Sequence, residues 1–66
     1  MSQAEVLVCL ERSSEPLNIT QISEKINLGE RNVQRALRIM LKYNEVEKIE
    51  EKGIKNVYKL NLELEE

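Results

Sequence analysis

Four basic side chains recur along one stretch of the sequence at the spacing of a single helix face. They are Arg31, Arg35, Arg38 and Lys42, called here the basic stripe. At about 100 degrees per residue they fall within roughly 60 degrees of one another, opposite the apolar positions of the same stretch. The guanidinium group of Arg is a planar fork of donors that suits phosphate oxygens and the edge of guanine. These residue types at this spacing indicate a surface that binds an anionic partner.

The distribution of charge sets the basic stripe apart from the rest of the chain. The 66 residues include ten Lys or Arg and twelve Glu, which gives a formal charge of -2. Residues 30–43 alone carry +3, whereas residues 1–29 carry -2 and residues 44–66 carry -3. Like charges three or four positions apart on a helix destabilise it by about 0.2–0.5 kcal/mol per pair. A face built only for solubility would interleave Glu with these cations, so we expect an external partner to accept the charge.

The residue types that are missing argue against catalysis. With no His, no Asp and one Cys, the sequence has no His-based acid or base, no four-ligand zinc site and no internal disulfide. Neither of its two Gly stands in a phosphate-binding loop, and its two Tyr are too few to form a platform that stacks single-stranded bases. We therefore expect no enzyme, no cofactor, no metal and no small-molecule site.

Apolar runs are too short for a membrane segment. The longest, Val6 to Leu10, has five residues, against roughly 20 for a membrane-spanning helix. No signal-peptide pattern precedes it. We expect a cytoplasmic protein that forms one small domain.

The chain is predicted to be an α+β domain with three helices followed by a hairpin. Helical spacing and capping residues place a first helix within residues 1–15, a second at about 19–27 and a third at about 30–43. Asn18 and Gln21 have the spacing of a capping box. Gly29 can cap the third helix or take a positive φ, and Asn44 can end that helix in the left-handed conformation.

After Asn44 the apolar residues no longer recur at helical spacing but at every second position, as they do in a strand. This predicts a hairpin within residues 45–61, with strands at 46–49 and 56–60 and a tip near Lys52 and Gly53. We expect residues 62–66 to form a tail that either extends the second strand or covers a neighbouring element. Cys9 is interpreted as a small buried hydrophobe, and Tyr43 and Tyr58 are expected to pack at the ends of the third helix and the hairpin. The remaining positions predicted to face the core are Val6, Leu7, Leu10, Ile19, Ile22, Ile26, Leu28, Val33, Ala36, Leu37, Met40, Leu41, Val46 and Leu60.

Three pairs of apolar residues occur in a characteristic order. They are Ile22 and Ile26, then Val33 and Leu37, then Tyr58 and Leu60. Through these pairs the segments "PLNITQISEKINLGERNVQRALRIMLKYNEVEKI" and "NVYKL" resemble the winged helix-turn-helix domains of bacterial and archaeal transcription regulators. The resemblance implies a three-helix domain with a β-hairpin wing. It also implies a regulator that binds double-stranded DNA and reads the major groove with the helix at 30–43.

The resemblance also assigns roles to individual residues. Base reading falls to Arg31, Asn32, Gln34, Arg35 and Arg38. Phosphate contacts fall to Thr20, Gln21, Lys25 and Lys42, and wing contacts to Lys52 and Lys55. Glu30 either supplies a favourable negative charge at the helix N-terminus or accepts a hydrogen bond from cytosine.

Two features depart from the usual pattern of this family. The chain is acidic overall, and Glu50 and Glu51 adjoin the wing cations, so we expect weak nonspecific affinity for DNA. Winged helices that bind left-handed DNA carry a Tyr on the outer face of the third helix and a Pro-rich wing with Trp. This chain has Arg38 at that position and neither Pro nor Trp in the wing, so we do not expect left-handed DNA to be its ligand.

Apolar residues that point away from the predicted core suggest a homodimer. They are Val8, Ile39, Leu62 and Leu64. A second interpretation of the whole chain is a winged-helix module that binds another protein within a transcription or replication assembly. In that case the basic stripe would contact an acidic partner.

Overall fold

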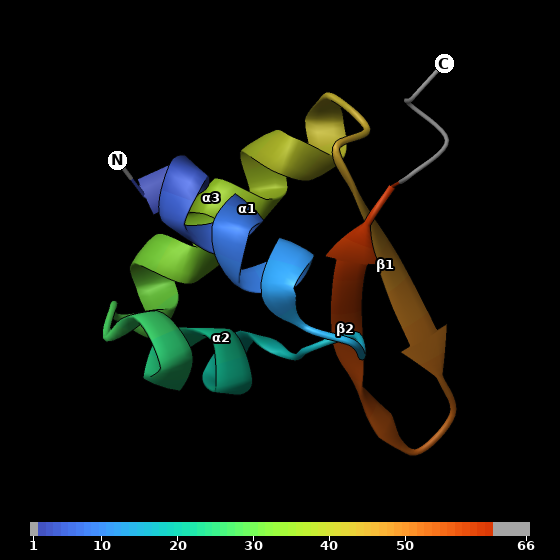
Figure 1. Cartoon of the computed structure of the whole chain (residues 1–66). Coiled ribbons are helices and arrows are strands. Elements are labelled where there is room, and N and C mark those ends of the chain that lie inside the picture. Colours follow the sequence, from blue (N-terminus) through green and yellow to red (C-terminus); the bar gives the residue numbers. More distant parts are fainter. Residues whose placement is uncertain (1, 62–66) are drawn as a thin grey trace.

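The computed structural model describes residues 2–61 and contains three helices followed by two strands (Figure 1). The helices are α1 (Ser2–Arg12), α2 (Ile19–Ile26) and α3 (Glu30–Lys42), and the strands are β1 (Val46–Glu51) and β2 (Ile54–Leu60). This order confirms the predicted α+β fold. The predicted tail at 62–66 lies outside the described residues.

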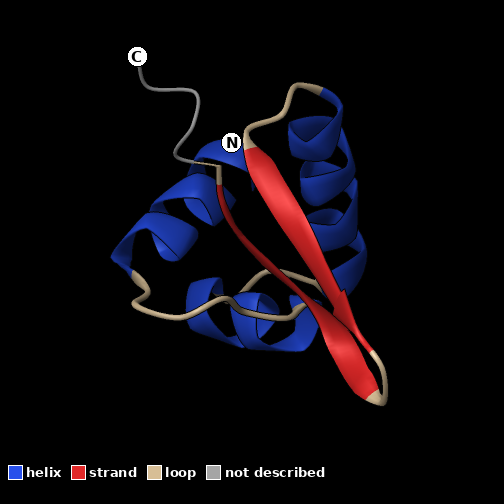
Figure 2. Ribbon diagram, turned by 90° about the vertical axis from the view of Figure 1, so that its right-hand side faces the viewer, coloured by secondary structure: helices blue, strands red, loops and turns tan. Residues whose placement is uncertain are grey.

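The three helices pack on one another, and the hairpin closes one side of the bundle. α1 contacts α2, α3 and β2, while β1 packs on α3. The turn of the hairpin projects beyond the helices (Figures 1 and 2). One further backbone link lies outside the named strands. The amide of Leu17 donates to the carbonyl of Tyr58 at 3.0 Å, and the amide of Tyr58 donates to the carbonyl of Leu17 at 2.7 Å, so the α1–α2 loop is tied to β2.

The helix ends are fixed largely as the capping residues predict. The Asn18 side chain accepts from the Gln21 amide at 2.8 Å, and the Gln21 side chain accepts from the Asn18 amide at 2.9 Å, which confirms the capping box. Asn44 has a φ of 61°, as expected after α3. Gly29 is the N-cap of α3 with a φ of -59°, so its expected alternative of a positive φ is wrong. The left-handed residue of this turn is Asn27, with a φ of 55°.

The hairpin is longer than its apolar pattern predicts. β1 and β2 are antiparallel, with Val46 opposite Leu60, and only Lys52 and Gly53 lie between the strands. The ladder extends through the charged residues near the tip because backbone hydrogen bonds do not require apolar side chains. A register shift between Ile49 and Glu51 and the φ of 76° at Gly53 accommodate the tight turn.

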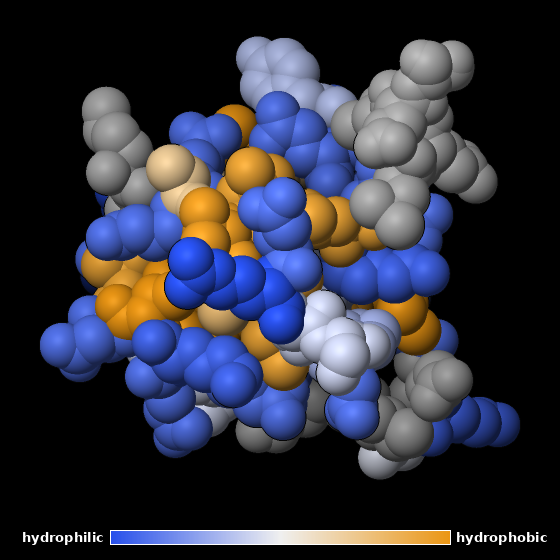
Figure 3. Space-filling model, in the orientation of Figure 1, coloured by the Kyte–Doolittle hydropathy of each residue, from blue (hydrophilic) through white to orange (hydrophobic). Residues whose placement is uncertain are grey.

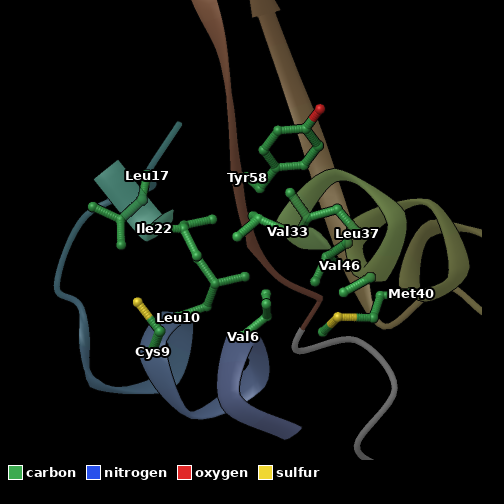
Figure 4. Packing of buried hydrophobic residues seen from close by; sticks show 11 residues of the cluster. Val6, Cys9, Leu10, Leu17, Ile22, Val33, Leu37, Met40, Val46 and Tyr58 are labelled. Carbon is green, nitrogen blue, oxygen red and sulfur yellow. The ribbon is translucent and has the colours of Figure 1, made fainter. Parts of the chain in front are cut away.

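Within the described residues, one hydrophobic core draws on every helix and strand (Figure 4). Its buried members are Val6, Cys9, Leu10, Leu17, Ile22, Val33, Ala36, Leu37, Met40, Val46 and Tyr58. The predicted burial of Cys9 and the predicted packing of Tyr58 are confirmed. Leu17 was not predicted, because its burial follows from the long-range backbone link to Tyr58.

Two residues expected to pack are instead exposed. Leu7 is 37% exposed, because it lies at the edge of the face that α1 buries and borders an open groove. Tyr43 is 62% exposed. It is the C-cap residue of α3, beyond the part of the helix that packs on the core. The Lys42 ammonium stands 5.8 Å from the centre of that ring.

We expect the hairpin turn to depend on the glycine at its tip. Replacing Gly53 by Ala forces a Cβ into the left-handed region at φ 76°, so we expect a loss of about 1–2 kcal/mol in the free energy of unfolding. Lys52→Ala is the matched control, since Lys52 is an exposed residue of the same turn without a positive φ. Denaturant unfolding followed by circular dichroism measures both. Equal stability of the Gly53→Ala variant and the unmodified chain would contradict this account.

Candidate nucleic-acid interface

α3 has a buried face and an opposite face that is wholly open to solvent. Val33, Ala36, Leu37 and Met40 point into the core. All four residues of the basic stripe are exposed on the other side. The helical spacing therefore correctly predicted which residues of α3 face the core and that the basic stripe faces solvent. The stripe extends over about three turns of the helix.

The remaining residues assigned to base reading lie on the same helix. Asn32 and Gln34 are exposed, as are the three arginines of that set. Within residues 2–61, none of these five side chains has a hydrogen bond or ion pair to another residue. Their donors and acceptors are therefore available to a ligand. Their individual roles remain predictions.

Glu30, the first residue of α3, is held by a residue of α2. The hydroxyl of Thr20 donates to a carboxylate oxygen of Glu30 at 3.0 Å. The negative charge also lies at the positive end of the α3 dipole, where it is favourable. Glu30 therefore has a structural role, because the hydrogen bond from Thr20 links α2 to α3 and the negative charge stabilises the start of α3. Capping rules did not indicate the contact with Thr20, because it spans ten residues and depends on the angle between the two helices.

The residues assigned to phosphate binding do not form one cluster. Thr20 lies beside the start of α3, but its hydroxyl hydrogen is committed to Glu30. The side-chain oxygen of Gln21 is committed to the α2 cap. Lys25 lines an open groove between α1 and α2, together with Val8 and Arg12. Lys42 lies at the end of the basic stripe on α3, so it shares a helix face with the base-reading arginines and has no hydrogen bond or ion pair among the described residues.

The wing carries its charge differently from the expected pattern. Lys52 is exposed at the projecting turn, and the side chain of Lys55 lies outside the described part of the chain. Glu50, which was expected to repel phosphate beside Lys52, forms an ion pair with Lys48 at 3.3 Å. Glu47 pairs with Lys59 at 3.7 Å. Both pairs are exposed and weak, and only the Lys48–Glu50 pair lies towards the tip, where it partly offsets the charge of Glu50.

The residues predicted to form a dimer interface lie on separate elements. Val8 on α1 is 40% exposed and Ile39 on α3 is 37% exposed. Leu62 and Leu64 lie outside the described residues.

Cys9, next to Val8, is a free thiol whose pKa is raised by burial, and the nearby Lys25 ammonium opposes this shift. The thiol is therefore protonated near neutral pH.

Two other kinds of site were sought in the part of the chain that the structure describes. No group of three Cys or Glu side chains there is arranged to hold a metal ion. No helix within residues 2–61 is long and apolar enough to cross a membrane.

Comparison with known proteins places the fold. No protein-family model matches the chain, and no curated protein sequence is significantly similar to it. Among solved structures, the chain is similar to the apo form of the Zalpha domain of zebrafish PKZ, with a TM-score of 0.84 over 89% of each chain. The sequences are 20% identical. The chain therefore has the winged-helix fold.

We expect the contact between Thr20 and Glu30 to be measurable as a coupling energy. A double-mutant cycle with Thr20→Val and Glu30→Ala should give a coupling of about 0.5–1 kcal/mol, because the hydroxyl donates to a charged oxygen in a partly solvated site. Urea unfolding measures the four variants. A parallel cycle of Thr20→Val with Glu11→Ala should give no coupling, since Glu11 is an exposed residue of α1 that makes no hydrogen bond with Thr20. Coupling within error of zero in the first cycle would remove the proposed link between α2 and α3.

Proposed function

We propose that the chain binds double-stranded DNA as the reading domain of a transcription regulator, with α3 in the major groove. The observation that carries this proposal is the solvent face of α3, on which Asn32, Gln34 and the basic stripe are exposed and have no hydrogen bond or ion pair among the described residues. A recognition helix in a major groove needs donors and acceptors of this kind, preorganised on a rigid element.

Residues at the start of α3 are expected to contact bases, and residues at its end are expected to contact the phosphate backbone. The first turns of a recognition helix approach base edges, whereas later turns diverge towards the phosphates. Arg31 and Arg35 then suit guanine, and Asn32 and Gln34 suit adenine, because each side chain can form two hydrogen bonds with that base. Lys42, at the end of α3, suits phosphate.

The charge balance predicts a particular response to salt. The basic stripe releases counterions when it meets phosphate, so affinity should fall steeply as salt rises. The rest of the chain is acidic, so binding to random duplexes should be weak at moderate salt. Retention on duplex DNA at low salt followed by release at moderate salt is the expected behaviour.

The identifying experiment is selection of binding sites from random duplexes. An enriched sequence supports the proposal. Selection should be run beside a duplex held in the left-handed form, because Arg38 stands where binders of that form carry Tyr. Preference for the left-handed duplex, or no duplex binding at all, would contradict the proposal, and the latter would favour the alternative that the basic stripe docks an acidic protein.

We expect two positions on α3 to have different effects on recognition. Arg35→Ala should weaken the selected site by about 1–3 kcal/mol and relax one base position. Lys42→Ala should weaken all duplexes alike and reduce the salt slope by about one, because it removes a phosphate contact. Fluorescence anisotropy with selected and scrambled duplexes measures both effects.

Lys59→Ala is the control for these two variants. It removes one exposed cation on β2 that is already paired with Glu47. It should change affinity less than either α3 variant does. Unchanged duplex binding in both α3 variants, with the fold intact by circular dichroism, would rule out α3 as the reading helix.

We expect the wing to add affinity without adding sequence choice. The double change Lys52→Ala and Lys55→Ala should lower affinity by a similar factor for selected and random duplexes, because a wing cation meets phosphate or the minor groove, where the readable pattern is degenerate. Repeating the site selection with this variant measures the outcome. A changed consensus sequence would make the wing a reader and contradict the assignment.

A further inference from the structure

α1 presents an apolar surface on the side of the molecule shown in Figure 3, where hydrophobic side chains gather over this helix and along its edges. Leu7 and Val8 are 37% and 40% exposed. Val8 borders an open groove between α1 and α2, called here the α1–α2 groove. It is lined by Ala4, Glu5, Val8, Cys9, Arg12, Ser13, Lys25 and Ile26.

Four of the residues that line the groove form a stripe with opposite charges at its ends. Glu5, Val8, Cys9 and Arg12 are spaced i, i+3, i+4 and i+7 along α1 and share one edge of the helix. Glu5 and Arg12 are two helical turns apart, too far to pair with each other. Within the described residues neither side chain has another ion-pair partner.

This stripe is complementary to itself when two copies are antiparallel. A two-fold axis between Val8 and Cys9 places Glu5 of each copy opposite Arg12 of the other. The same axis places Val8 opposite Cys9 of the second copy, so the apolar centre is covered as the charged ends pair. A parallel arrangement would instead place Glu5 against Glu5 and Arg12 against Arg12. The charge order therefore selects the antiparallel arrangement.

We propose that the chain forms a homodimer in which α1 of each copy lies in the α1–α2 groove of the other. Ile26 and Lys25 of α2 form the far wall of the groove, so the incoming helix contacts two elements of its partner. No residue that lines the groove belongs to α3. The basic stripe consequently stays exposed in each copy of the dimer. Ile39 belongs to α3 and takes no part in this interface.

A charge-exchange experiment in the absence of DNA tests the proposal. Sedimentation equilibrium from low to high micromolar concentration should show reversible dimers. Glu5→Arg and Arg12→Glu should each weaken association about tenfold, because each variant replaces two attractive pairs with two like-charge pairs at the rim. The double variant should recover most of the original affinity, since the exchanged pairs are again attractive.

The double variant separates pairing across the interface from damage to α1. Each single change places a charge unfavourably on the α1 dipole, and the double variant carries both unfavourable charges. If weaker association came from a damaged helix, the double variant would associate more weakly than either single variant. Recovery of association therefore requires pairing between copies.

Two apolar substitutions locate the surface. Val8→Glu should abolish dimers over the same concentration range, because it buries an unpaired charge at the centre of the contact. Ile39→Glu is the matched control and should leave association unchanged, since Ile39 has similar exposure but lies outside the groove. Circular dichroism checks that each variant is folded.

Three results would overturn this interface. They are a monomeric mass throughout the concentration range, a double variant no better than the single variants, and equal effects of Val8→Glu and Ile39→Glu. None of them bears on the DNA-binding proposal, because association is measured without DNA. Conversely, Arg35→Ala should leave the dimer intact even where it removes duplex recognition.

Discussion

Each helix and strand packs on the same small core, and the size of that core decides which surfaces remain free. A chain of 66 residues buries a smaller share of its surface than a large domain does, so one set of inward faces must hold all five elements. Val33, Leu37 and Met40 anchor α3 through one narrow face. Because the opposite face of α3 takes no part in packing, its cations are free of any role in holding the fold together.

The sequence was informative where one local pattern was strong enough to fix an element. The apolar spacing of α3 predicted its burial, and the Asn18–Gln21 capping box fixed the start of α2. Leu7 was misplaced because a residue at the edge of an apolar face is buried only if a neighbour covers it. The exposure of Tyr43 likewise depends on which elements surround the end of α3, and local spacing carries no such information.

Contacts between distant residues set the remaining details. The paired hydrogen bonds of Leu17 and Tyr58 join a loop to a strand about forty residues later, so no local signal predicts them. The contact of Thr20 with Glu30 depends on the angle between two helices. The solvent face of α3 was predictable from helical spacing, but the commitment of Thr20 to a neighbour was visible only in the assembled fold.

The uneven distribution of charge favours one direction of approach to a polyanion. Residues 30–43 carry +3, whereas the rest of the chain carries -5. A phosphate backbone is therefore attracted to α3, whereas residues 2–29 carry -2 and residues 44–61 carry no net charge. The ion pairs of Lys48 with Glu50 and of Lys59 with Glu47 keep the hairpin from adding strong attraction of its own. The charges thus determine which face of the domain meets a polyanion more than they raise the overall affinity for it.

Under the proposed function, a DNA-binding domain whose charge favours one orientation but whose affinity is weak benefits from acting as a pair. When one copy of a dimer is bound to DNA, the second copy meets a neighbouring site at a high effective concentration, provided that the geometry lets both engage at once. Residues 2–29 of each copy carry -2, which disfavours placements in which they, rather than α3, face the duplex. In the proposed dimer both basic stripes stay exposed, so under the proposed function its discrimination between sequences would come from two contacts with DNA rather than from stronger attraction to phosphate in either copy.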